Sequence, residues 1–103
     1  MSGFALHSEA YDDIDEIRAY LAENSPDAAD SVVNEIFDRL RRLTQFPKQG
    51  FRRSQFTSLP LRFVTVRDYL IAYAPDTDPL RIIAVIHGRR SPRVIAAILR
   101  GRE

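Results

Sequence analysis

The sequence predicts an α+β domain in which an antiparallel helix hairpin packs on an antiparallel sheet. Two observations predict it. Apolar residues recur at helical spacing in two stretches of the first half, and the second half holds three apolar runs separated by turn residues. A short N-terminal strand that joins the sheet and a short C-terminal helix complete the expected fold. With 103 residues, the whole chain (1–103) is expected to form one domain around one modest core.

The first helix is predicted at residues 9–23, directly after a short strand at residues 4–7. Ser8 ends the strand and is a suitable N-cap, because its hydroxyl can accept a hydrogen bond from the first turn. For His7, at the junction, we expect a local hydrogen bond or solvent exposure in preference to catalysis. Negative charge that complements the helix dipole is supplied by Glu9, Asp12 and Asp13, and the apolar stripe consists of Ala10, Ile14, Ile17 and Leu21.

The second helix is predicted to begin at Pro26 and to end near Phe46. Ser25 is its expected cap, and Pro26 takes the first helical position, where a missing N–H has no cost. Because the connection between the helices is short, they should form an antiparallel hairpin with a solvated acidic face. The apolar stripe consists of Ala29, Val32, Val33, Ile36, Leu40 and Leu43.

Residues 47–60 form a basic loop that contains two phenylalanines, Phe51 and Phe56. Its cations are Lys48, Arg52 and Arg53, and regular structure is broken at Pro47, Gly50 and Pro60. Cations beside aromatic rings are typical of nucleic-acid surfaces, where they contact phosphates and stack on bases. A loop whose two rings dock under the helices explains the same pattern, and the sequence leaves both interpretations open.

Three strands are predicted at residues 61–66 and 69–73 and in the stretch 80–90, joined by tight turns into an antiparallel meander. The last strand is apolar at nearly every position and rich in β-branched residues, so it should be a central strand covered on both faces. Side-chain alternation places Arg62, Val64 and Val66 on one face of the first strand, and Val85, His87 and Arg89 on one face of the last. It does not decide whether Arg62 and His87 share a face.

The end of the last strand carries a histidine, a glycine and two arginines, in the order His87, Gly88, Arg89, Arg90. A rigid strand that delivers polar groups to its end is a common way to build a site. After it, residues 91–100 are predicted to form a short helix with Ser91 as its cap and an apolar stripe along one side. This helix could close the core or remain mobile until a partner covers it.

The charge is strongly asymmetric along the chain. Residues 1–47 carry ten acidic and four basic side chains, whereas residues 48–103 carry four acidic and eleven basic ones, ten of them arginine. Arginine suits phosphate and carboxylate groups well, so an anionic partner is one explanation for the basic half. A solvated surface whose charges balance is the other.

Other features limit the classes of function. The chain has no cysteine and only two histidines, which lie far apart in sequence, so we expect no metal site and no cofactor. No apolar run reaches the roughly 20 residues that span a bilayer, and the N-terminus lacks the features of a signal peptide. We therefore expect a cytoplasmic protein that does not contact membranes.

Three motifs in this order resemble the RelE/ParE superfamily of bacterial type II toxin–antitoxin toxins. They are Pro60-Leu61-Arg62-Phe63, Tyr69-Leu70-Ile71-Ala72-Tyr73, and the stretch from Ile82 to Arg90. The resemblance implies a small cytoplasmic toxin that forms a hetero-oligomer with a cognate antitoxin. It also implies one of two activities: ParE-like members, of the plasmid-stabilisation type, poison DNA gyrase, and RelE-like members are metal-independent ribonucleases that cut mRNA on the ribosome.

The residues favour the ParE-like activity. RNA cleavage needs a base, an acid and cations on the phosphate, and only the cations and His87 are evident. The resemblance implies that RelE-like sites use a glutamate, a lysine cluster and a C-terminal tyrosine. None of these has a match here: residues 48–67 contain no Asp or Glu, Lys48 is the only lysine, and no tyrosine follows Tyr73. We therefore predict a gyrase inhibitor, with mRNA cleavage as the alternative and a degenerate fold that only binds its antitoxin as a third hypothesis.

The candidate functional residues are Arg62, His87, Arg89 and Arg90, with supporting binding residues Lys48, Arg52, Arg53, Tyr73 and Arg93. Structural roles compete with these. Arg62 could instead form an ion pair with a helix acid such as Glu35 or Asp38, and His87 could be a hydrogen-bonded residue that ends the strand.

Overall fold

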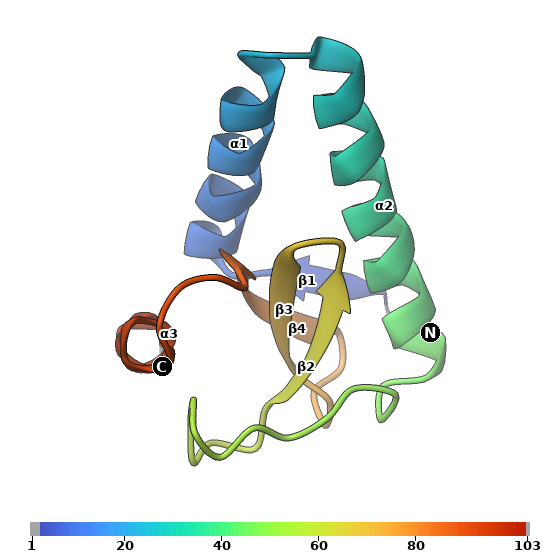
Figure 1. The fold of residues 1–103 in the computed structure, drawn as a ribbon. Helices are drawn as coiled ribbons and strands as arrows, with labels where there is room; N and C mark the ends of the chain where they lie inside the picture. The colour runs from blue at the N-terminus through green and yellow to red at the C-terminus, as the bar shows by residue number, and fades with distance from the viewer. Residues whose placement is uncertain (1–2, 103) are drawn as a thin grey trace.

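Two helices stand on one face of a four-stranded sheet, and a third helix lies against the other face (Figure 1). The structure is a computed structural model, and it describes residues 3–102. Its elements are β1 (Phe4–Leu6), α1 (Ser8–Ala22), α2 (Pro26–Gln45), β2 (Arg62–Val66), β3 (Tyr69–Ala74), β4 (Leu80–His87) and α3 (Pro92–Arg100). None of the helices in this part of the chain combines the length and apolar character needed to cross a membrane.

The strands are arranged in the order β1-β4-β3-β2. Strands β2, β3 and β4 form the predicted antiparallel meander, and the predicted α+β class is confirmed. One detail differs, because β1 pairs with β4 in parallel, with Phe4 opposite Leu80 and Leu6 opposite Ile82, so the sheet is mixed. A strand of three residues carries no sequence signal for its direction.

The helix boundaries follow the capping residues. Ser25 accepts a hydrogen bond from the N–H of Ala28 (3.2 Å) and Ser91 accepts one from Val94 (3.2 Å), so both predicted caps are confirmed. The predicted cap Ser8 is wrong, because His7 caps α1 instead, its Nδ1 accepting from the N–H of Glu9 (3.1 Å). The contact with Glu9 confirms the local hydrogen bond expected for His7. The N–H of His7 donates to the carbonyl of Ile82 (2.9 Å), which holds the residue in this position.

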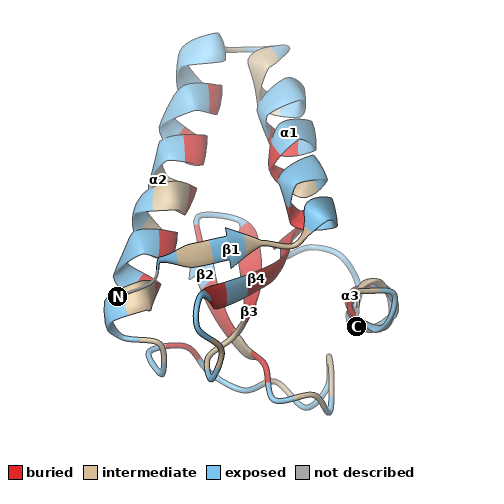
Figure 2. Cartoon of the chain, turned by 180° about the vertical axis from the view of Figure 1, so that it is seen from behind, coloured by how far each residue is buried: buried red, intermediate tan, exposed pale blue. Residues whose placement is uncertain are grey.

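Strand β4 is buried on both faces, as its composition predicts (Figure 2). Ile82 and Val85 face the core beneath α1 and α2, whereas Ile83, Ala84 and Ile86 face the core beneath α3. Ile95 and Leu99 of α3 are each 1% exposed, so the C-terminal helix closes this second core.

A register shift interrupts the pairing of β3 with β4. Ala72 lies opposite Ala84 and Tyr73 lies opposite Ile82, which makes Ile83 an extra residue. A bulge of this kind reverses the side-chain alternation beyond it. His87 therefore lies on the face of the sheet that α1 and α2 cover, together with Val85.

Tyr73 fixes the start of the loop between α2 and β2. Its buried hydroxyl donates to the carbonyl of Pro47 (2.7 Å) and accepts from the N–H of Gly50 (2.9 Å). A side chain at Gly50 does not fit, since an added Cβ would lie 2.6 Å from the Tyr73 hydroxyl oxygen and 2.7 Å from the carbonyl oxygen of Phe63. Burial raises the pKa of Tyr73.

Replacing Tyr73 by Phe should lower the free energy of unfolding by about 1–3 kcal/mol, because two buried backbone groups lose their partner. Chemical denaturation of both proteins at neutral pH measures this difference.

The stability of the Tyr73→Phe variant should fall less than that of the original protein as the pH rises. A folded-state pKa raised above the ordinary 10.0 stabilises the fold fully below that pH, and this contribution is lost as the pH rises through the raised value. Tyr73→Phe should therefore flatten the alkaline decline of stability, with a remainder from Tyr69, whose pKa burial also raises. Equal alkaline declines in both proteins would contradict the assigned role of the Tyr73 hydroxyl.

Candidate functional site

The end of β4 is held by hydrogen bonds in the turn that follows it. The N–H of Gly88 donates to the carbonyl of Asp68 in the β2–β3 turn (2.7 Å), and the N–H of Arg90 donates to the carbonyl of His87 (3.1 Å). The side chains of Arg89 and Arg90 are exposed. This end of the sheet therefore presents two guanidinium groups from a fixed backbone.

The imidazole of His87 is fixed by two contacts. Its Nδ1 accepts a hydrogen bond from the N–H of Arg89 (3.1 Å), and its ring meets Tyr69 edge-on with centroids 5.4 Å apart. Because Nδ1 is an acceptor, the neutral ring carries its proton on Nε2. Nε2 can donate a hydrogen bond but cannot take up a proton, so the ring is poorly arranged to act as a general base.

A hollow of about 340 Å³ opens beside His87, between α1, the sheet and α3. Glu16 on α1 and Arg90 both line it, so the lining carries charges of both signs. The other polar side chains around it are Asp13, Tyr20 and Tyr69. The combination of phenols with two acids and one guanidinium is amphipathic and suits a protein side chain better than a phosphate group.

Arg62 lies far from this hollow, although it shares the sheet face of His87. Arg62 is opposite Tyr73 and His87 is opposite Tyr69, so four residues of β3 and two strand spacings separate them, on the order of 16 Å. The Arg62 guanidinium donates to the carbonyls of Lys48 (3.3 Å) and Gly50 (2.7 Å). Its place is therefore at the base of the α2–β2 loop.

The helix acids suggested as partners of Arg62 bind other arginines. Glu35 accepts from Nε of Arg67 (2.9 Å) in the β2–β3 turn, and Asp38 pairs with Arg41 one turn along α2. The bond from Arg67 lowers the pKa of Glu35.

The remaining predicted binding residues do not gather at one place. Lys48 and Arg52 are exposed on the α2–β2 loop, where Lys48 pairs with Asp76 (3.4 Å), and Arg53 is half-buried beside them. Arg93 is exposed on α3. Tyr73 is 0% exposed, so it supports the loop from below and offers no surface to a partner.

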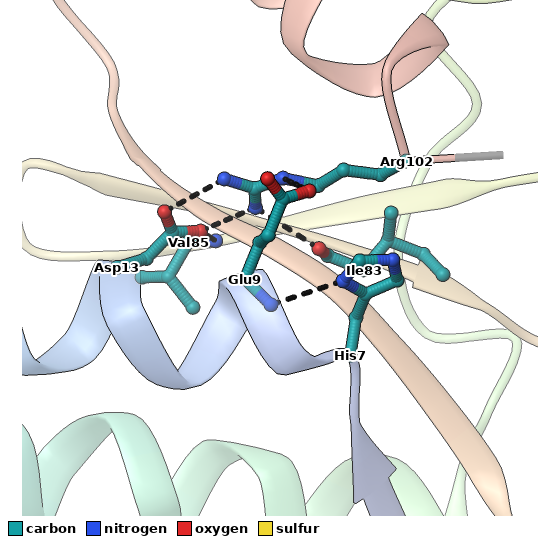
Figure 3. A network of polar contacts seen from close by, with 6 residues as sticks. All are labelled: His7, Glu9, Asp13, Ile83, Val85 and Arg102. Carbon is teal, nitrogen blue, oxygen red and sulfur yellow. Dashed lines mark hydrogen bonds and ion pairs between the residues drawn. The ribbon is translucent and has the colours of Figure 1, made fainter.

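An ion pair between Asp13 and Arg102 joins α1 to the segment after α3 (Figure 3). The two side chains form a bidentate contact, with Nη2 of Arg102 2.9 Å from Oδ1 of Asp13. Asp13 also accepts from the N–H of Val85 (2.9 Å), and Arg102 also donates to the carbonyl of Ile83 (3.1 Å). Bonding to Asp13 raises the pKa of Arg102, whose side chain is only 10% exposed.

This ion pair closes an edge of the sheet. Strand β1 covers β4 only from Leu80 to Ile82. On this side of β4, away from β3, the backbone groups of Ile83 and Val85 have no strand beside them. Asp13 and Arg102 satisfy these groups in place of a strand, which matters because a buried backbone group without a partner is costly.

Comparison with known proteins identifies the family. The family model described as the ParE toxin of the type II toxin–antitoxin system parDE matches residues 4–92, from β1 to the first residue of α3. The chain belongs to the ParE toxin family. It is a ParE-type toxin of a toxin–antitoxin system, and membership implies an antitoxin as a partner.

Two curated relatives of this ParE-type toxin carry the name Toxin ParE2 and come from Mycobacterium tuberculosis strains CDC 1551 / Oshkosh and ATCC 25618 / H37Rv. Each is 29% identical over 102 residues, which cover 94% of this chain and 91% of the relative.

The sequence did not indicate the ion pair that this toxin uses to fix its C-terminal segment. Asp13 stands among the acids expected to form a solvated helix face, and 89 residues separate it from Arg102. The position of Asp13 three residues after the buried Ala10 and next to Ile14 is the one signal that it borders the core. Within residues 3–102, no three His, Cys, Asp or Glu side chains lie together as possible metal ligands.

Arg102→Gln should lower the free energy of unfolding by about 3 kcal/mol, because it leaves the largely buried charge of Asp13 without its partner. Asp13→Asn should cost less, because Arg102 keeps its longer contact with Glu9 (3.4 Å). The double variant should lose less than the sum of the two single losses. Urea denaturation of the four proteins measures this coupling.

The matched control is Glu35→Gln, which removes an acid from the exposed pair with Arg67 and should change the urea midpoint little. If the Asp13 and Arg102 variants are as mild as this control, the pair does not fix the C-terminal segment.

Proposed function

We propose that this ParE-type toxin inhibits DNA gyrase in the cytoplasm, through protein contact at the end of β4. The observation that carries the proposal is the surface formed by His87, Arg89, Arg90 and the adjoining hollow. Arginine and tyrosine side chains are enriched among the residues that dominate protein–protein binding energy. Here two exposed arginines stand beside a hollow lined by Tyr20 and Tyr69.

The arrangement gives less support to mRNA cleavage. A ribonuclease needs a proton acceptor next to cations that hold the phosphate, but Nδ1 of His87 is occupied, and the acids Asp13 and Glu16 line the same hollow as Arg90. Arg62, which could have added a cation, is at the opposite end of the sheet. The hydroxyl of Tyr73 is buried and bonded to the loop backbone.

A cognate antitoxin would neutralise the toxin as part of a hetero-oligomer. The second half of the chain, with eleven basic and four acidic side chains, would attract an acidic segment of such a partner. The antitoxin and gyrase would then compete for the toxin, and co-expression of the antitoxin should restore growth.

Expression of the toxin alone in a bacterial host should stop growth and induce a DNA-damage response while transcripts stay intact. Reporter fusions and RNA sequencing after induction measure both effects. Rapid cleavage of transcripts within codons would replace the gyrase proposal with the ribonuclease alternative, and unaffected growth would favour a fold that only binds its antitoxin.

Substitution of Arg89→Ala together with Arg90→Ala should weaken gyrase inhibition about 30-fold or more, as expected when residues at the centre of an interface are truncated. A supercoiling assay with purified gyrase measures the concentration for half inhibition. The melting temperature should stay the same because both side chains are exposed.

The matched control is Arg81→Ala with Arg100→Ala, which removes the same charge from exposed positions elsewhere. If this control loses inhibition to the same extent, net charge rather than the end of β4 determines the activity. A fall in melting temperature for the Arg89/Arg90 variant would show that these arginines are structural.

A further inference from the structure

Hydrogen bonds anchor the first part of the loop between α2 and β2, from Pro47 to Phe51. It runs along the end of the sheet opposite His87 (Figure 1). Tyr73 holds the carbonyl of Pro47 and the N–H of Gly50, and Arg62 holds the carbonyl of Gly50 at 2.7 Å. Phe51 then pairs with Phe63 through two backbone hydrogen bonds of 3.0 and 2.8 Å. Phe51 is therefore presented from a backbone that is hydrogen-bonded to the sheet.

The two phenylalanines of the loop behave differently. Phe56 packs on Phe63, with ring centroids 5.4 Å apart, and joins the second core. Phe51 is 71% exposed although its backbone is fixed in the β-bridge. The interpretation in which both rings dock under the helices is therefore wrong. Phe56 docks on the other face of the sheet, and Phe51 remains open to solvent.

The residues that follow Phe51 in the chain line a hollow of about 310 Å³. It is lined by two arginines and three hydroxyl side chains, together with Leu59 and Leu61; the polar set is Arg52, Arg53, Ser54, Thr57 and Ser58. Oγ1 of Thr57 accepts from the N–H of Leu59 (3.0 Å), which leaves the hydroxyl proton free to donate. Every polar side chain in this lining is thus a possible donor to an anion.

The charge around the hollow is of one sign. The loop residues 47–61 carry Lys48, Arg52 and Arg53 and contain no Asp or Glu. Of the acids elsewhere, Asp76 reaches the loop, where it pairs with Lys48. Neither Asp nor Glu is among the residues that line the hollow itself.

We propose that this loop binds single-stranded nucleic acid, with a phosphate in the hollow lined by Arg52 and Arg53 and a base stacked on the ring of Phe51. Guanidinium forks and hydroxyls are the groups that hold phosphate oxygens. An exposed aromatic ring such as that of Phe51, which directly precedes Arg52 in the chain, is the usual platform for an unpaired base. Binding requires no cleavage of the strand and no gyrase, so it goes beyond the proposed function.

An acidic peptide would satisfy the cations but explains less of this surface. A carboxylate and the phosphodiester of a nucleic-acid strand each present two charged oxygens, so the side chains around the hollow could hold either group. The exposed ring of Phe51 can stack on a base, but it has no comparable contact to make with an acidic side chain.

Fluorescence anisotropy of the full-length toxin with labelled oligonucleotides of about 12 nucleotides tests the proposal. Separate titrations with DNA and RNA strands show which of the two nucleic acids the loop binds more tightly. We expect binding to a single strand that is tighter than binding to the matching duplex, because paired bases cannot stack on Phe51. The affinity should fall as salt concentration rises.

Two variants separate the phosphate contacts from the stacking contact. Arg52→Gln with Arg53→Gln should lower the slope of log affinity against log salt by about 1.4, since two phosphate contacts are lost. Phe51→Ala should weaken binding about 5- to 100-fold while leaving that slope unchanged. The control, Arg81→Gln with Arg100→Gln, removes the same net charge from exposed sites outside the loop and should retain the slope.

Three results would overturn the proposal. They are no binding at low salt, equal losses in the Arg52/Arg53 variant and its charge control, and capture of a polyglutamate peptide but not of either oligonucleotide. Melting curves of every variant show whether the loop is still folded. If the double substitution of Arg52 and Arg53 unfolds the protein, the Phe51→Ala variant is the remaining test. Its binding should be weaker, while the dependence of its affinity on salt concentration should stay the same.

Discussion

Strand β4 can be buried only if both of its faces and its free edge are covered, and the rest of the molecule supplies that cover. Helices α1 and α2 cover one face and α3 covers the other. Strand β1 reaches only as far as Ile82, so the edge beyond it depends on side chains. Asp13 and Arg102 complete this edge by bonding to Val85 and Ile83. An ion pair between residues near the two ends of the chain thus stabilises the central strand.

The same strand separates two surfaces of different chemistry. At its C-terminal end, the bulge at Ile83 turns His87 toward α1, where Glu16 and Arg90 share an amphipathic hollow. At the opposite end of the sheet, the α2–β2 loop is uniformly basic and carries an exposed ring. The first surface suits a protein partner and the second suits a polyanion, so the two need not compete for one ligand.

These surfaces are consistent with a ParE-type toxin that acts by binding. The groups nearest to a catalytic arrangement are engaged elsewhere: Nδ1 of His87 accepts from the backbone, and the guanidinium of Arg62 supports the loop. A gyrase inhibitor on DNA would have a use for both surfaces, one for the enzyme and one for an unpaired strand. The antitoxin would then have two surfaces of different chemistry to cover.

The sequence by itself determined the elements and their class. Helical spacing, Ser25 and Ser91 as caps, and the continuous apolar run of β4 are local signals, and the structure confirms each of them. Tertiary structure alone decided the direction of β1, the bulge at Ile83, the burial of Tyr73 and the pairing of Asp13 with Arg102. These features depend on which distant residues meet. A periodic pattern shows that a residue lies on a face, but it does not show which partner that face will contact or at which end of the sheet the residue will be.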